Sequence, residues 1–274
     1  MIKSIASVID DANRGQDFVC ALLEEAQAGG IFVYLTVLTT APMVSPRIAP
    51  LGSLYIPENE LRGEALDAVT CIRAAAGVGN EALLVKGLYG DVAWLAHDLR
   101  NDDDVSDLIV MGPAELWGVP WLRRRAIETL LLSSGTPLLL LPEEGPFPRL
   151  KRITLGWKPS AQAARIAHAI VLLAEPGAKI DVVTVGPMPE RNSGDEQPRC
   201  GIADFFRRHG LAPECHWLDE TETVETVLQD FALGSRADAL AVGGFAHSRV
   251  REIILGGVTR SLVDHCRLPI LMAH

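Results

Sequence analysis

The chain has 274 residues, 48% of them hydrophobic, and a net charge of −10, which fits one large globular domain or two ordinary ones. This acidic balance argues against a nucleic-acid partner, which would need a basic face, and we expect a cytoplasmic protein. Because no apolar run reaches the roughly 18 residues of a membrane helix, we expect no membrane partner. The first residues also show no signal-peptide pattern.

The five cysteines include no CxxC pair, and we expect them to be free, buried thiols in a reducing compartment. They are Cys20, Cys71, Cys200, Cys215 and Cys266. The alternative is a zinc site from His209, Cys215 and His216, which we disfavour because metal sites usually show tighter spacing. We therefore expect no metal site in the protein itself.

Hydrophobic patterning in the first half predicts strands and helices in alternation. The expected strands span 5–9, 31–38, 82–85, 107–112 and 137–141. The expected helices span 15–28, 58–76 and 91–99, followed by one that ends near 134. A proline-rich stretch at 39–57 predicts a long irregular loop, which could serve as a lid.

The same series of elements recurs in the second half, after a Pro/Gly-rich joint at 142–148. Strands are expected at 153–157, 180–185, 214–218, 239–242 and 269–272, and helices at 160–173, 200–209 and 222–233. Gly243 follows Gly112 by 131 residues (243 − 112), and Pro269 follows Pro137 by 132 (269 − 137). A near-constant offset indicates a duplicated domain. We predict two three-layer α/β/α domains, at 1–143 and 150–274, each with a five-stranded, mostly parallel sheet.

The stretch 238–259 has the pattern of an anion site. A buried strand ends at Gly243-Gly244, His247-Ser248-Arg249 follows, and a helical stretch leads to a second glycine pair before Val258 and Thr259. Glycines let the backbone approach a ligand, and the free N–H groups at helix starts favour negative charge.

The spacing within this stretch resembles the ATP motif of the universal stress protein family, Gly-x-x-Gly, nine residues, then Gly-Ser or Gly-Thr. Gly243, Ala246, Gly256 and Gly257 stand at the four places, so the spacing matches and two identities match. Together with the order of elements, the resemblance covers nearly the whole chain. It implies two tandem flavodoxin-like (Rossmann-like) domains with strand order 3-2-1-4-5. It also implies ATP or AMP as ligand, with no metal beyond a nucleotide-associated Mg²⁺.

Three departures from the family pattern affect the expected ligand. Ala246 adds a Cβ where a glycine is usual, and Gly257 removes a phosphate-binding hydroxyl, which Thr259 could replace. Lys158 stands where the family has an aspartate, and an ammonium group cannot accept hydrogen bonds from a ribose. Lys158 could instead meet a phosphate or another anion.

The first half shows the opposite pattern, because Asp10 is kept whereas Gly112 is followed by Pro113 and Glu115. Proline removes an N–H donor, and the glutamate would repel phosphate. We expect this half to have lost the usual site, with Asp10 and Gly112 as its weaker candidates. Arg123-Arg124-Arg125 is interpreted as a solvated face rather than an anion site.

Several residues have two possible interpretations. His247, Ser248 and Arg249 form either an anion clamp, or a helix cap with a solvated side chain. The pair Gly256-Gly257 either contacts a ligand or allows tight helix packing. For Trp117 and Trp121 we favour packing or an interface over a stacking platform. His168 is expected at the core or its edge.

No catalytic motif is visible, so at most very slow ATP hydrolysis is expected. The leading hypothesis is a nucleotide- or anion-binding stress protein whose ligand lies in the second half. The expected site residues are Trp157, Lys158, Val183, Gly243, Gly244, His247, Ser248, Arg249, Gly256, Gly257, Val258 and Thr259. The alternative is a scaffold that has lost nucleotide and acts through an unknown protein partner or another ligand. The strands at 137–141 and 269–272 are predicted edge strands that pair within one chain, as an internal pseudo-dimer, or between two chains of a homodimer.

Overall fold

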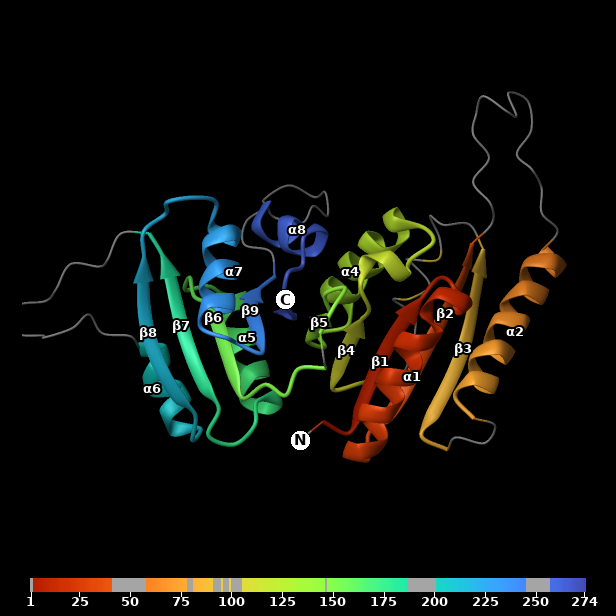
Figure 1. Ribbon diagram of the computed structural model, residues 1–274, viewed down its shortest axis with the longest axis horizontal. Helices are drawn as coiled ribbons and strands as arrows, with labels where there is room; N and C mark the ends of the chain where they lie inside the picture. The colour runs from red at the N-terminus through yellow and green to blue at the C-terminus, as the bar shows by residue number, and fades with distance from the viewer. Residues whose placement is uncertain are drawn as a thin grey trace, which may run out of the picture. The chain divides into compact units, whose positions relative to one another are not determined.

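The structure is a computed structural model that describes residues 2–40, 58–77, 81–90, 95, 99, 105–145, 147–186, 201–244 and 257–274 (Figure 1). Contacts divide the chain into two compact units, which we call the first unit, Lys3–Thr136, and the second unit, Pro137–His274. Among the described residues, no helix has both the length and the apolar character that crossing a bilayer requires.

The first unit contains four parallel strands in the order β3-β2-β1-β4. They are β1 (Ser4–Ile9), β2 (Phe32–Thr40), β3 (Leu83–Gly90) and β4 (Leu108–Met111). The helical elements are α1 (Ala12–Gly29), α2 (Glu58–Ala75), the short 3₁₀ helix η2 (Ala114–Leu116) and α4 (Pro120–Ser133). Asp11 begins α1, because its side chain accepts hydrogen bonds from the N–H groups of Asn13 and Arg14.

The second unit repeats this arrangement with the order β5-β10-β9-β6-β7-β8. Its strands are β5 (Leu138–Leu140), β6 (Arg152–Gly156), β7 (Lys179–Val185), β8 (Ala212–Leu218), β9 (Ala239–Gly243) and β10 (Ile270–Ala273). Its helices are α5 (Ala161–Leu173), α6 (Gly201–Arg208), α7 (Val224–Gly234) and α8 (Gly257–Asp264). Strands β6 to β10 are parallel and have the predicted order 3-2-1-4-5.

Strand β5 pairs antiparallel with β10, with Leu139 opposite Leu271. Contacts therefore place β5 in the second unit, whereas the sequence places the domain joint after it, at 142–148. The two predicted edge strands pair within one chain. Pairing between two chains stays a prediction.

The same pair of hydrogen bonds to an aspartate holds the start of the first strand in both repeats. The carboxylate of Asp107, just before β4, accepts hydrogen bonds from the N–H groups of Lys3 (2.7 Å) and Ser4 (3.0 Å). Asp238, just before β9, accepts them from Lys151 (2.6 Å) and Arg152 (2.8 Å). The two aspartates are 131 residues apart (238 − 107), so the duplicated pattern in the sequence corresponds to a duplicated contact.

In the second unit, α5 and α6 cover one face of the sheet and α7 covers the other (Figure 1). A Cβ on Gly243 would lie 2.9 Å from the backbone at the start of α5, whereas one on Gly156 would meet Leu228 of α7. Side chains alternate along a strand, so even-numbered residues of β6 and β9 point towards α7. This alternation decides which polar side chains can meet.

The expectation of a solvated arginine run needs correction. Arg123 is 4% exposed, because its position on α4 places it on the inner face, so it does not belong to a solvated run with Arg124 and Arg125. Trp117 is buried as expected, whereas Trp121 is 49% exposed, with the guanidinium of Arg125 5.9 Å from its ring.

The expectation of free thiols is confirmed for three cysteines and wrong for one. Cys20, Cys71 and Cys266 are free and half-buried. Cys215 is disulfide-bonded. Cys200 lies outside the described residues.

Candidate functional site

The predicted site in the second unit begins at the carboxyl ends of its central strands. Gly156 of β6 is paired with Val242 of β9, so Trp157 and Gly243 follow at the same edge of the sheet. The N–H of Trp157 donates to the carbonyl of Val183 at 2.7 Å. Open α/β sheets bind ligands at this edge.

Lys158 is exposed at this edge and carries a free positive charge. Within the part of the chain that the structure describes, no hydrogen bond or ion pair involves its side chain. The next residues start α5, where the Ser160 hydroxyl accepts a hydrogen bond from the N–H of Ala163 at 3.0 Å, as predicted.

Helix α8 supplies the second element of the site. It begins at Gly257 and leads into β10, which is parallel to β9, so a normal crossover places its start at the carboxyl edge of the sheet. Gly257 is exposed, and a Cβ there would meet no atom within 4 Å. Val258 is half-buried and Thr259 is 5% exposed, so the Thr259 hydroxyl points into the unit.

Gly243 and Gly244 take part in packing and in the sheet. Gly243 lies so close to the start of α5 that a Cβ would be 2.9 Å from the backbone N of Ala163. The N–H of Gly244 donates to the carbonyl of Ala273 at 2.7 Å, so it is engaged in the sheet. The remaining predicted site residues, His247, Ser248, Arg249 and Gly256, lie outside the described residues, as does Ala246.

In the first unit, the half-buried Asp10 bonds to the backbone just before α4. Its carboxylate accepts hydrogen bonds from the N–H groups of Gly118 (2.9 Å) and Val119 (2.8 Å), directly before the start of α4. Burial raises the pKa of Asp10, and the charge of Asp11 adds to this rise, although the two amide donors oppose it. An internal carboxylate thus occupies the kind of helix start that binds anions.

Gly112, the other candidate of the first unit, is closed off by apolar side chains. A Cβ at this position would be 3.3 Å from Phe18 and from Leu116, and the Gly112 carbonyl accepts a hydrogen bond from Arg123. That the first half has lost the usual site stays a prediction.

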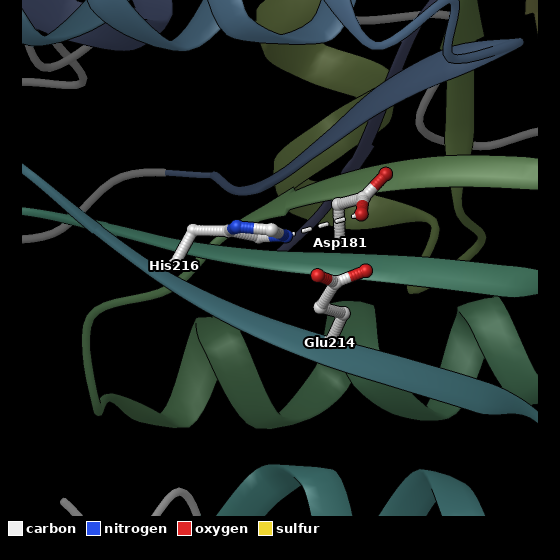
Figure 2. A group of neighbouring side chains, drawn as sticks. All are labelled: Asp181, Glu214 and His216. Atoms are coloured by element: carbon white, nitrogen blue, oxygen red, sulfur yellow. Dashed lines mark hydrogen bonds and ion pairs between the residues drawn. The ribbon is translucent and has the colours of Figure 1, made fainter. Parts of the chain in front are cut away.

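A group of polar side chains that the sequence did not bring together lies on the α7 face of the second unit (Figure 2). Asp181 of β7 is fully buried, and its Oδ1 is 3.2 Å from Nε2 of His216. The ligand atoms of Asp181, Glu214 and His216 all lie within 4.8 Å of one another. On the other side of Asp181, Nε of Arg152 donates to Oδ2 at 2.7 Å.

Strand alternation explains why this group differs from the zinc alternative considered from the sequence. Glu214 and His216 are two residues apart on β8 and share a face, whereas Cys215 points to the opposite face. His209 follows α6 and packs its ring on Phe205. The set His209, Cys215 and His216 is therefore not brought together, and the signal that was overlooked is the spacing Glu214-x-His216 beside Asp181.

No protein-family model matches the sequence, and no curated protein matches it. Among solved structures, the chain is similar to a universal stress protein from Archaeoglobus fulgidus DSM 4304. The TM-score is 0.61 at 13% identity, over 98% of this chain and 95% of that one.

Two structures from Pseudomonas aeruginosa are also similar. A putative universal stress protein from strain UCBPP-PA14 has a TM-score of 0.51 at 16% identity, over 99% of this chain and 93% of that one. A protein of unknown function from strain PAO1 has a TM-score of 0.54 at 14% identity, over 99% and 92%. At such identities the similarity establishes the fold, and the chain has the fold of the universal stress proteins.

Proposed function

We propose that the chain is a universal stress protein-type response protein whose second unit binds a nucleotide or another anion, without strong catalysis. The observation that carries this proposal is a difference between the repeats. In the first unit the Asp10 carboxylate occupies the region before α4, whereas Lys158 stands at the corresponding place of the second unit and is exposed. The second unit thus offers a cation where the first offers an internal anion.

Two further features support an anion at this edge. The start of α8 carries the partial positive charge of a helix N-terminus, and Gly257 leaves its backbone accessible. A phosphate placed between this helix start and the Lys158 ammonium would gain charge-assisted hydrogen bonds from both.

Calorimetric titration of the purified full chain with ATP, ADP, AMP and inorganic pyrophosphate tests the proposal. We expect binding that weakens at least about tenfold in Lys158→Glu, because the reversed charge repels phosphate. Arg208→Glu is the matched control, since Arg208 is equally exposed but ends α6 at the opposite edge of the sheet. No heat with any of the four ligands at millimolar concentration would overturn the proposal.

A second candidate is a scaffold that has lost nucleotide binding. Lys158 cannot accept hydrogen bonds from ribose, and the Gly244 N–H is already bonded to Ala273. If this candidate is right, the double variant Ala246→Gly, Lys158→Asp gains nucleotide affinity that the parent lacks. Equal affinity in parent and variant would count against it.

A further inference from the structure

We propose that Asp181, Glu214 and His216 form a binding site for a divalent transition-metal ion of the zinc class. The site lies on the α7 face of the second unit, within the strands β7 and β8 (Figure 2). It involves none of the residues proposed for the nucleotide or anion, so the two proposals stand or fall separately.

The distance between the two inner ligand atoms fits a shared metal ion. Zinc lies about 2.0–2.2 Å from imidazole nitrogen and carboxylate oxygen, so two such ligands are about 3.3–3.6 Å apart around a tetrahedral ion, slightly more than the distance found here. Nε2 of His216 and Oδ1 of Asp181 are 3.2 Å apart. An ion can therefore replace the proton that they share, with a small rotation of the ring.

Glu214 supplies the third ligand and closes the site from the solvent side. Its side chain is 55% exposed, so it can turn by the short distance that separates it from the other two. It belongs to the register pair Asp181–Glu214, which holds the two carboxylates side by side on neighbouring strands. The imidazole favours transition metals such as zinc or nickel, whereas carboxylates alone would suit magnesium or calcium.

Asp181 already has an outer partner that orients it, because Arg152 holds Oδ2 and leaves Oδ1 for the ion. Such outer contacts fix the direction of metal ligands. Lys179 lies 3.1 Å from Oε2 of Glu214, where its charge competes with an ion for that carboxylate. The two cations also cancel the negative charge of the carboxylates, so we expect moderate affinity.

Independent support comes from Thr154 on the neighbouring strand β6. It is paired in register with Asp181, so both side chains project from the same face of the sheet. Thr154 is fully buried, and its hydroxyl oxygen has no hydrogen-bond partner among the described residues. Buried polar groups rarely stay unpaired, and a water on the open position of the ion could bond to this hydroxyl.

The rival explanation is that Arg152 and His216 only neutralise the buried charge of Asp181. The two explanations differ in the role of Glu214, which has no part in neutralising Asp181. They also differ in the effect of Lys179, whose ammonium competes with a metal ion for Glu214. Variants of these two residues therefore separate a metal site from a structural ion pair.

The test is titration of the metal-free full chain with Zn²⁺ by calorimetry and with Co²⁺ by visible absorption. We expect one ion per chain and a cobalt spectrum of nitrogen and oxygen ligation. Affinity should fall at least about tenfold in Glu214→Gln and in His216→Gln, because each loses a ligand. It should rise several-fold in Lys179→Gln, because a competing positive charge is removed. Asp204→Asn is the matched control, because Asp204 is an exposed carboxylate on α6, on the other face of the sheet.

Absence of Zn²⁺ binding to the parent chain at millimolar concentration would overturn the proposal. So would wild-type affinity in both Glu214→Gln and His216→Gln. Circular dichroism of every variant shows whether it is folded. If Glu214→Gln or His216→Gln is unfolded, Lys179→Gln distinguishes the two explanations, because its half-exposed ammonium contacts Glu214 at the surface and its loss leaves the core intact. Tighter binding then supports the site, and unchanged or weaker binding overturns it.

Discussion

At the scale of single residues, the half-buried Asp10 and the exposed Asp107 respond to their surroundings in opposite ways. Burial raises the pKa of Asp10, whereas hydrogen bonds from the N–H groups of Lys3 and Ser4 lower the pKa of Asp107. A carboxylate whose pKa is raised on folding costs stability when it ionises, and one whose pKa is lowered adds stability. The two residues therefore predict opposite dependences of stability on pH.

For Asp10 we expect the wild type to lose stability relative to Asp10→Asn as the pH rises. The ordinary pKa is 3.8, and the folded value is higher, so the folded state holds the proton more tightly between the two values. Stability from this group is fully present below 3.8 and lost as the pH rises through the folded pKa. Urea unfolding of both proteins across this pH range measures the difference. A wild-type stability that stays level or rises relative to that of Asp10→Asn as the pH rises would contradict the prediction.

For Asp107 the sign reverses. Its folded pKa lies below the ordinary 3.8, so it contributes stability above 3.8 that is lost as the pH falls through the folded value. Asp107→Asn should therefore be less stable than the wild type at neutral pH, and the gap should narrow in acid. The readout is the same urea series, with Asp17→Asn on α1 as control. If the stability difference between wild type and Asp107→Asn widens in acid, the lowered pKa of Asp107 is not its cause.

At the scale of elements, the two glycine pairs of the predicted motif serve different ends. Gly243 allows β9 to approach the start of α5, because a Cβ would meet backbone atoms at 2.9 Å. Gly257 opens α8 with free space around it. Sequence spacing cannot distinguish a glycine required by packing from one with free space around it. The distinction lies in the atoms that a Cβ at each position would meet.

Alanine at these two positions should therefore act differently. We expect Gly243→Ala to destabilise the protein by about 1–3 kcal/mol, because the helix start must shift. Gly257→Ala should be neutral or stabilise by up to about 1 kcal/mol, since it reduces the freedom of the unfolded chain. Chemical denaturation of both variants gives the comparison, and equal losses would show that contact with α5 is not the reason for Gly243.

The pattern of strands and helices could be predicted because each element carries its own periodicity. Strands such as β4 and β9 are short apolar runs, and their offset of 131 residues revealed the repeat. The side-chain partners could not be predicted in this way. The sequence predicts Asp10 near a ligand, but whether it accepts bonds from Gly118 and Val119 depends on how the chain enters α4.

The polar group on β7 and β8 shows the same limit. The predicted strand order makes β7 and β8 neighbours, but nothing in the sequence states their register. With Asp181 opposite Glu214, alternation places Asp181, Glu214 and His216 on one face and turns Cys215 away. The register is thus the information that converts separate residues into a site.

At the scale of the whole molecule, β5 decides where the second unit begins. Its three leucines are fully buried, and it pairs with β10, although it follows the last helix of the first repeat. The sequence-based boundary at 150 would cut β5 away from β10. The boundary from contacts, at Pro137, keeps the pair together.

Two fragments of the chain distinguish these boundaries. We expect the fragment 137–274 to unfold at a higher urea concentration than 150–274, because only the longer one retains the β5–β10 hydrogen bonds and covers Leu271. In the shorter fragment, the four buried residues of β10 lose the strand that pairs with them. Equal midpoints would place the boundary after β5 and make that strand dispensable to the second unit.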